Sequence, residues 1–269
     1  MLGAIVGDIV GSRFEFHNHR SKEFELFTDE CFVTDDSIMT LAVAKALKKT
    51  QSKAKRLGLT SFDEEYLNLL KRNTIHYMQE IGRKYPDCGY GGRFYSWIFS
   101  DDPQPYNSFG NGAAMRISPV GIFARSKREV LILSDVITAV SHNHPEGIKG
   151  ARATALAVYM ARKGSGLEEI RESIISEYYP IDFTIDEIRD TYRFNETSQE
   201  TVPQALQCFF ESTSFEDAIR IAVSVGGDTD TIAAIVGGIA EAYYGVPEDI
   251  KDRALSYLDD YLLSLYQSL

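Results

Sequence analysis

The spacing of apolar residues is helical along almost the whole chain. Apolar side chains recur every three and four residues, as amphipathic helices require, whereas the alternating pattern of strands is nearly absent. The predicted helices cover residues 37–48, 62–82, 130–141, 149–163, 168–178, 203–211, 215–225, 231–244 and 248–266. The pattern therefore predicts an all-α protein.

Two of these segments, Ile38 to Leu47 and Ile232 to Tyr244, are apolar on nearly every face. A helix of that kind is normally surrounded by other helices, so we expect both to be central. Glycine-bearing stretches around residues 89–92, 109–112 and 142–147 predict loops between helices. Because neither a linker nor an internal repeat interrupts the chain, we expect one compact multi-helix domain over residues 1–269, with its function where loops converge on the bundle.

The composition narrows the classes of function. Of the 269 residues, 44% are hydrophobic and 25% charged, which is enough apolar material for a buried core. The net charge of -11 argues against nonspecific binding to nucleic acid or to anionic lipid, because both need a basic surface. No apolar run reaches the length of a membrane span, so no membrane association is expected.

The cysteines and the first residues bear on the compartment. Cys31, Cys88 and Cys208 are odd in number and lack C-x-x-C spacing, which indicates neither a disulfide framework nor a thiolate zinc site. The start of the sequence has no basic segment and reaches an acidic residue at Asp8, unlike a secretory signal. We therefore expect a cytoplasmic protein.

Clustered acidic residues stand at the start of each of the two buried segments. Thr34-Asp35-Asp36 opens one, and Gly226-Gly227-Asp228-Thr229-Asp230-Thr231 opens the other. Residues two apart within a helix point to nearly opposite sides, so Asp228 and Asp230 can converge only where glycines turn the chain into the helix. Oxygen ligands without histidine or thiolate suit hard cations such as Mg²⁺ or Mn²⁺.

Helix capping is the alternative interpretation of each cluster. Asp and Thr are favoured at N-caps, and acidic side chains in the first turn complement the helix dipole. Taken singly, each cluster favours capping. Several carboxylates beside an apolar core are costly unless a cation neutralises them, so the two clusters together predict a site for two metal ions.

Glu15 is a candidate catalytic carboxylate, and the alternative is a surface acid paired with Arg13 or Lys22. The glycines that precede it are too loosely spaced for a dinucleotide-binding fingerprint. The stretch from Ser108 to Arg116 offers backbone N–H groups that could hold a diphosphate at a helix start, although Asn-Gly is also a common turn. His142 and His144 match no zinc spacing, and local hydrogen bonding is the alternative for both.

Taken in order, these motifs resemble the ADP-ribosylglycohydrolase superfamily over essentially the whole chain. The motifs are Gly7-Asp8-x-x-Gly11-x-x-x-Glu15, Thr34-Asp35-Asp36, Gly89-Tyr90-Gly91, Asn111-Gly112-x-x-Met115-Arg116, His142, and Gly226-Gly227-Asp228-Thr229-Asp230-Thr231-Ile232. The resemblance implies an all-α bundle with a binuclear Mg²⁺ or Mn²⁺ centre. The metal ligands that it implies are Thr34, Asp35, Asp36, Asp228, Asp230 and Thr231.

The same resemblance implies that Glu15 lies beside the scissile bond and that Glu15 or Asp35 accepts a proton from water. It implies an ADP-ribose cleft lined by Gly89, Gly91, Ser108, Phe109, Asn111, Gly112 and His142. The expected substrate is an ADP-ribosylated protein or small molecule, and the expected reaction is hydrolysis of the bond between ADP-ribose and its acceptor.

Three points about the function stay open from the sequence alone. A magnesium-dependent nucleotide phosphohydrolase would also use two metals near a diphosphate. A catalytically silent ADP-ribose-binding protein is a further alternative. The acceptor could be arginine, serine, a nucleic acid base or a small molecule, because it contacts variable loops; residues 16–31 could form such an acceptor-facing loop or a lid.

Overall fold

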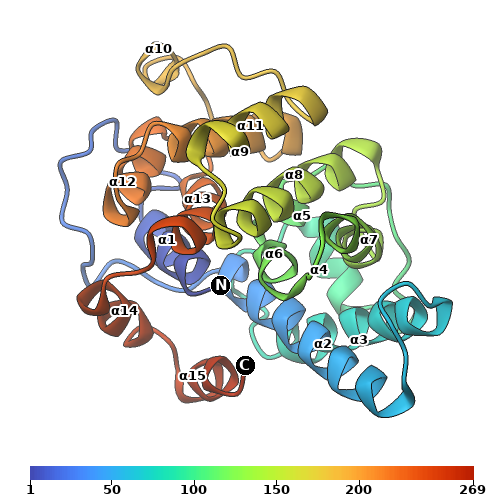
Figure 1. The fold of residues 1–269 in the computed structure, drawn as a ribbon. Helices are drawn as coiled ribbons and strands as arrows, with labels where there is room; N and C mark the ends of the chain where they lie inside the picture. Colours follow the sequence, from blue (N-terminus) through green and yellow to red (C-terminus); the bar gives the residue numbers. More distant parts are fainter.

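The fold consists of helices and connecting loops in a computed structural model that describes residues 1–269 (Figure 1). The helices are α1 (Leu2–Ser12), α2 (Asp35–Leu57), α3 (Glu64–Gly82), α4 (Gly92–Phe99), α5 (Gly112–Met115), α6 (Ser118–Phe123), α7 (Lys127–Thr138), α8 (Pro145–Arg162), α9 (Leu167–Glu177), α10 (Ile185–Ile188), α11 (Ser198–Phe210), α12 (Phe215–Val225), α13 (Thr229–Tyr244), α14 (Glu248–Leu255) and α15 (Asp260–Gln267). There is no β-sheet, and β-type pairing is limited to one isolated bridge between Gly110 and Thr197. The predicted all-α class is confirmed.

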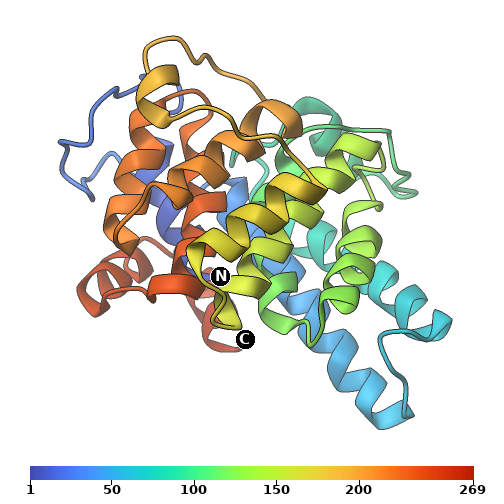
Figure 2. The same ribbon diagram turned by 45° about the horizontal axis from the view of Figure 1, so that its top comes forward.

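The centre of the bundle is formed by α1, α13 and the first half of α2. Every residue of α1 is buried, and so is every residue of α13 from Thr229 to Ala240. Between Ile38 and Leu47 of α2, only Lys45 is not fully buried. The expectation that these two apolar segments are central is therefore confirmed for Ile38 to Leu47 and for Ile232 to Ala240, whereas residues 241–244 are only partly buried. In the turned view, α8 and α11 cross the bundle in front of this core (Figure 2).

Helix α1 was not among the helices predicted from the sequence, because three glycines weaken its helical propensity. Those glycines allow α1 to lie directly against α13. A Cβ atom on Gly7 would overlap the carbonyl group of Ala233, and one on Gly3 would overlap the carbonyl oxygen of Gly237. Tertiary packing therefore outweighs propensity here, and the glycine spacing that did not fit a dinucleotide fingerprint is a helix-packing surface.

Two other expectations are corrected by the structure. The single helix predicted over residues 248–266 is two helices, because the chain turns after Leu255 and the Asp259 carboxylate caps α15 by accepting the Leu262 N–H at 2.8 Å. The glycine stretches predicted as loops contain helical residues, since α5 begins at Gly112 and Gly147 lies within α8. In that position Gly147 lets the Ser108 carbonyl oxygen approach, 2.8 Å from where a Cβ would stand.

The ends of several helices meet on one side of this core. The end of α1, the start of α2 and the start of α13 converge there, and the loop that leads into α5 joins them. None of the helices is both long and apolar enough to cross a membrane.

Candidate functional site

A cavity of about 410 Å³ opens where these helix ends meet. All but one of the residues predicted from the sequence contribute to its lining, namely Glu15, Thr34, Asp35, Asp36, Gly89, Gly91, Ser108, Asn111, Gly112, His142, Asp228, Asp230 and Thr231. Phe109 is the exception. Its ring is 44% exposed and packs edge-on against His144, while its carbonyl oxygen accepts the Ser198 N–H. Phe109 therefore orders the loop from outside the cavity.

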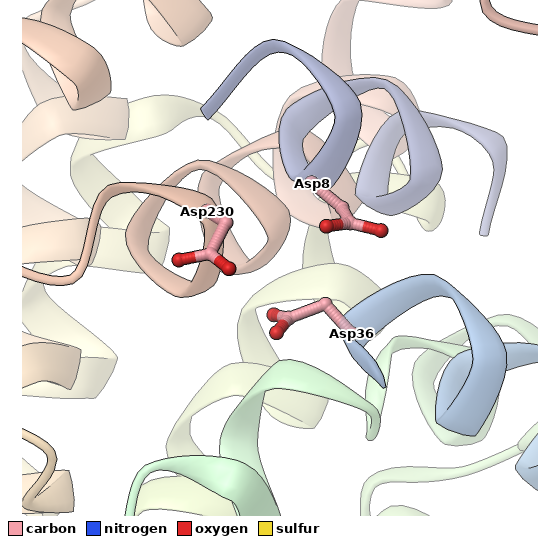
Figure 3. Close-up of side chains that lie close together, drawn as sticks. All are labelled: Asp8, Asp36 and Asp230. Atoms are coloured by element: carbon pink, nitrogen blue, oxygen red, sulfur yellow. The ribbon is translucent and has the colours of Figure 1, made fainter. Parts of the chain in front are cut away.

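Three buried carboxylates lie together beside the cavity (Figure 3), and two of them, Asp36 and Asp230, line it. Asp8 comes from α1, Asp36 from α2 and Asp230 from α13, and their nearest carboxylate oxygens are all within 4.8 Å of one another. Asp8 was absent from the candidates drawn from the sequence. The available signal was that Asp8 is the only charged residue in an otherwise apolar and glycine-rich helix.

A second group of three carboxylates shares Asp230 with the first. Glu15 and Asp228 have oxygens within 4.8 Å of each other and of an Asp230 oxygen. Asp228 and Asp230 converge because Gly226 and Gly227, with φ of 72° and 76°, turn the chain abruptly into α13. The two overlapping groups could therefore hold two cations side by side, with Asp230 between them.

Helix capping accounts for part of this arrangement. Thr34 is the N-cap of α2, and its hydroxyl oxygen accepts the Asp36 N–H at 3.3 Å. Asp8 accepts the Thr34 hydroxyl at 2.6 Å and the N–H groups of Thr34 and Ser37, each at 3.1 Å. Both oxygens of Asp8 are thus occupied by the protein. Asp8 holds the start of α2 in place and presents the Thr34 oxygen toward the cavity.

Capping leaves the central carboxylates unsatisfied. Asp36 Oδ1 and Asp230 Oδ1 are buried and have no hydrogen-bond donor. Asp36 Oδ2 accepts only the Thr231 hydroxyl, at 3.2 Å. A buried carboxylate oxygen without a donor is costly, and a cation removes that cost. The oxygen-only donor set suits Mg²⁺ or Mn²⁺, so these residues fit such ions.

Burial and mutual repulsion raise the pKa values throughout this acidic group. Loss of water, followed by the charge of neighbouring carboxylates, raises the pKa of Asp36 and of Asp230 well above the ordinary value. Burial and the nearby Asp230 raise the pKa of Glu15 to about 8 and that of Asp35 to about 8. Without a cation, this group holds protons near neutral pH.

Glu15 and Asp35, the two candidate catalytic carboxylates, both line the cavity. Glu15 makes no ion pair, because Arg13 lies 3.8 Å from Glu30 and Lys22 pairs with Asp217. The surface-pair interpretation of Glu15 is therefore wrong. Asp35 lines the cavity outside both three-carboxylate groups. Its N–H donates to the Cys88 carbonyl, and its side chain lies close to the backbone of Gly89.

A buried cation, Arg116, lines the same cavity. Arg116 is only 1% exposed and its guanidinium lies over the Phe94 ring at 4.7 Å. Its Nη2 donates to Ser141 Oγ at 2.9 Å and contacts His142 Nδ1 at 3.1 Å, while its Nε and Nη1 have no acceptor. Burial and this guanidinium hold the pKa of His142 well below its usual range, so the imidazole is neutral.

Two of the three backbone N–H groups at residues 110–112, in the loop near Arg116, already donate hydrogen bonds within the protein. The Gly110 N–H donates to Ser108 Oγ at 3.1 Å and the Asn111 N–H to the Glu196 carbonyl at 2.8 Å, which leaves Gly112 as the open donor of the three. Asn111 also donates its side-chain amide to Asp228 at 2.7 Å. Asn111 therefore links the loop to the acidic group. His144, by contrast, caps α8 by accepting the Glu146 N–H, which agrees with local hydrogen bonding.

Comparison with known proteins agrees with this geometry. The sequence matches the ADP-ribosylglycohydrolase family over residues 1–269, and the chain belongs to that family. It is 28% identical to ADP-ribosylarginine hydrolase Tri1 of Pseudomonas putida, over 95% of this chain and 73% of that protein. It is 23% identical to human ADP-ribosylhydrolase ARH3, over 98% and 90%. It is also 26% identical to ADP-ribosyl-[dinitrogen reductase] glycohydrolase of Rhodospirillum rubrum, over 96% and 88%.

A solved structure described as an ADP-ribosylglycohydrolase-related protein complex has the same fold. It superposes with a TM-score of 0.67 and covers 98% of this chain and 94% of its own. At 22% sequence identity, this similarity is evidence for the fold alone.

Proposed function

We propose that the protein is a metal-dependent hydrolase that cleaves the glycosidic bond between ADP-ribose and an acceptor, releasing ADP-ribose. The observation that carries this proposal is a pair of carboxylate groups that share Asp230 and have buried oxygens without donors. Four of the five carboxylates in those groups line one cavity together with Arg116, a buried cation with two nitrogens that have no acceptor. A ligand with hydroxyl groups at one end and a diphosphate at the other matches both ends.

The proposed cofactor is two Mg²⁺ or Mn²⁺ ions. Thr34, Asp35, Asp36, Asp228, Asp230 and Thr231 would hold them, with Asp8 fixing Thr34 through their hydrogen bonds. When bound, such ions supply Lewis-acid stabilisation of negative charge and lower the pKa of water. We expect the metal ions to ionise the carboxylates, since a nearby cation lowers a carboxyl pKa.

Glu15 and Asp35 are the proposed proton-handling carboxylates. Both line the cavity, and each has a pKa of about 8 in the metal-free site. Either side chain, once ionised, can accept a proton from the attacking water at a carboxylate oxygen. The group of acids around the distal ribose also stabilises the positive charge that develops on that sugar as the acceptor leaves.

The acceptor end of the proposed substrate lies at the cavity mouth. Phe16 contributes to the lining, is 76% exposed, and stacks on Phe194 with ring centroids 6.0 Å apart. This arrangement supports the view that the loop after Glu15 faces the acceptor. The relatives named above act on ADP-ribosylarginine, in the case of Tri1, and on ADP-ribosylated dinitrogen reductase. We propose ADP-ribosylated side chains as the substrate class.

The test is a panel of arginine-, serine- and nucleic acid-linked ADP-ribose conjugates, each incubated with Mg²⁺, with Mn²⁺ and with EDTA. Release of intact ADP-ribose from at least one conjugate, only when metal is present, is the expected result. AMP with ribose phosphate as the products would identify a phosphohydrolase instead. Binding of ADP-ribose without turnover of any conjugate would indicate a catalytically silent binding protein.

A further inference from the structure

The hydrogen bonds around His142 place a charged donor on one side of its ring. Nδ1 lies 3.1 Å from Arg116 Nη2 and 2.8 Å from Ser141 Oγ. Nε2 makes no hydrogen bond within the protein and lies beside Gly110 and Gly112, 3.5 and 3.3 Å from where their Cβ atoms would stand. The ring also packs near Phe94 and Tyr106. The two nitrogens therefore face different surroundings, one closed by protein and one at the cavity loop.

A guanidinium group can only donate hydrogen bonds. A hydrogen on Nδ1 would therefore point at another donor, and it would bring positive charge against a buried cation. Ser141 cannot decide the matter alone, because a hydroxyl both donates and accepts. Its oxygen already accepts from Arg116 Nη2, which frees its proton to point at Nδ1. Arg116 thus favours an unprotonated Nδ1, and the Ser141 hydroxyl is compatible with it.

We propose that Arg116 is a positioning residue that locks His142 in the tautomer with hydrogen on Nε2, so that the imidazole donates a hydrogen bond to an anionic group at Gly110–Gly112. This inference rests on the proposed function, which supplies the diphosphate as the anion. In the opposite tautomer, Nε2 would present a lone pair to that anion and repel it. Arg116 therefore acts through His142 as well as through its own charge.

The burial of Arg116 supports a role in binding an anion. A guanidinium that is 1% exposed, with Nε and Nη1 unpaired, is an expensive group to retain in a core. Stacking on Phe94 and two contacts through Nη2 hold it in one orientation. The cost is offset when an anion occupies the cavity, because the interior screens charge less than water does.

The tautomer is measurable directly in ¹⁵N-labelled, full-length protein without ligand. Long-range ¹H–¹⁵N correlation spectra separate a protonated from an unprotonated imidazole nitrogen, and the H142Q variant identifies the His142 signals among the five histidines. We expect wild type to show Nε2–H alone. Arg116→Lys should keep that tautomer, because an ammonium group also only donates. Arg116→Met should give a mixture, whereas Ser141→Ala should not.

Binding supplies a second readout that needs no turnover. Calorimetric titration with ADP should show an affinity at least about tenfold weaker for His142→Phe, which loses a hydrogen bond to a charged group. Arg116→Met should weaken it by a similar factor, because it removes the buried positive charge and the control of the His142 tautomer. His142→Gln restores a donor and should recover part of the affinity.

A wild-type spectrum with hydrogen on Nδ1 would overturn the proposal, even if Arg116→Met failed to fold. Retention of the pure Nε2–H tautomer in a folded Arg116→Met protein would also overturn it. Both outcomes are independent of hydrolysis, so a failed conjugate assay with a locked tautomer would reject the proposed function and leave the lock intact.

Discussion

The cavity brings together groups of opposite charge from different parts of the fold: an acidic end, formed by the carboxylates, and a cationic end, formed by Arg116 and its neighbours. At one end, Asp36 and Asp230 carry buried oxygens without donors, on the long central helices α2 and α13. At the other end, Arg116 carries buried nitrogens without acceptors, just after the four-residue helix α5. Each end lacks a partner that a ligand can supply, a cation for the carboxylate oxygens and an anion for the Arg116 nitrogens, which explains why these polar atoms stay without hydrogen bonds.

The difference also shows how the two ends are held. The acidic end is fixed by helix packing, because Gly7 brings α1 against α13 and Asp8 anchors the start of α2. The cationic end is fixed by side-chain hydrogen bonds and ring stacking around Arg116. Asn111 is the direct link between the ends, since it stands in the loop and donates to Asp228. The charges of Asp35 and Asp36 also act on the pKa of Arg116, so we expect a substitution to act mainly, and not solely, on its own end.

Replacing Asp230 should have the largest effect, because Asp230 belongs to both carboxylate groups. We expect Asp230→Ala to lose turnover by about a thousandfold or more, since bound metal contributes several kcal/mol to transition-state stabilisation. Affinity for ADP, which lacks the distal ribose, should be unchanged. Kinetics with a conjugate and calorimetry with ADP measure the two effects. A parallel loss of ADP affinity would show that the ends are not separate.

Asp230→Ala should also raise the thermal stability of the metal-free protein, since it removes a buried carboxyl group whose Oδ1 has no hydrogen-bond donor. The stabilisation by Mg²⁺ should disappear in the same variant. Thermal melts in EDTA and in Mg²⁺ test both expectations. Asp252→Asn, on the exposed side of α14, is a matched acidic control and should behave as wild type in each condition.

Asp8→Asn should have an intermediate effect. The amide oxygen can still accept both N–H groups, of Thr34 and Ser37, but its NH₂ group would then face the Thr34 hydroxyl. The hydroxyl could no longer donate there, so the Thr34 oxygen would lose the orientation that Asp8 gives it. Loss of such a supporting partner typically weakens metal binding by about 10- to 100-fold. Titration with Mn²⁺ measures the change, and binding of ADP should not move. Unaltered Mn²⁺ affinity would mean that Thr34 is held without Asp8.

The contrast between the ends also explains what the sequence could predict. The acidic clusters could be predicted from the sequence because each stands at the start of a segment whose apolar pattern indicates a central helix, namely Asp35-Asp36 and Asp228 to Thr231. Asp8 was missed because its partners at Thr34 and Ser37 are 26 and 29 residues away, and only the fold brings them together. The glycines around it lowered the helical signal of α1, although they are what permits its packing.

The cationic end was harder to predict from the sequence, because its contacts also join residues that are far apart along the chain. Arg116 was visible only as the last residue of a motif, and its contacts with Ser141 and His142 join segments 25 and 26 residues apart. Phe109 was predicted in the cleft but does not line the cavity, because a loop can turn one side chain outward while its neighbours Ser108 and Gly110 line it. No periodicity fixes the direction of a side chain in such a loop.

The pH dependence of stability sharpens the comparison, because only the acidic end titrates near neutrality. Glu15 and Asp35 have pKa values of about 8 in the folded protein and about 4 when unfolded. Between those values the folded state binds more protons than the unfolded state, so the free energy of unfolding falls as pH rises.

In EDTA, the melting temperature should therefore drop by several degrees between pH 5.5 and 8, at roughly 2–4 °C per kcal/mol for a chain of this size. Saturating Mg²⁺ should flatten the dependence, because bound cations ionise the carboxylates at both pH values. Differential scanning calorimetry in both conditions makes the measurement. The same slope with and without Mg²⁺ would contradict a metal site at the acidic end.

The smallest effect is expected at the cavity mouth, outside both charged ends. Phe16→Ala removes a 76% exposed ring that stacks on Phe194. If this ring contacts the acceptor, KM for a conjugate should rise by about two- to tenfold, the range for one aromatic contact. Affinity for ADP and thermal stability should not change. Leu57→Ala, 53% exposed at the far end of α2, is the matched apolar control. Weaker ADP binding in Phe16→Ala would instead place this ring on the ADP-ribose side of the scissile bond.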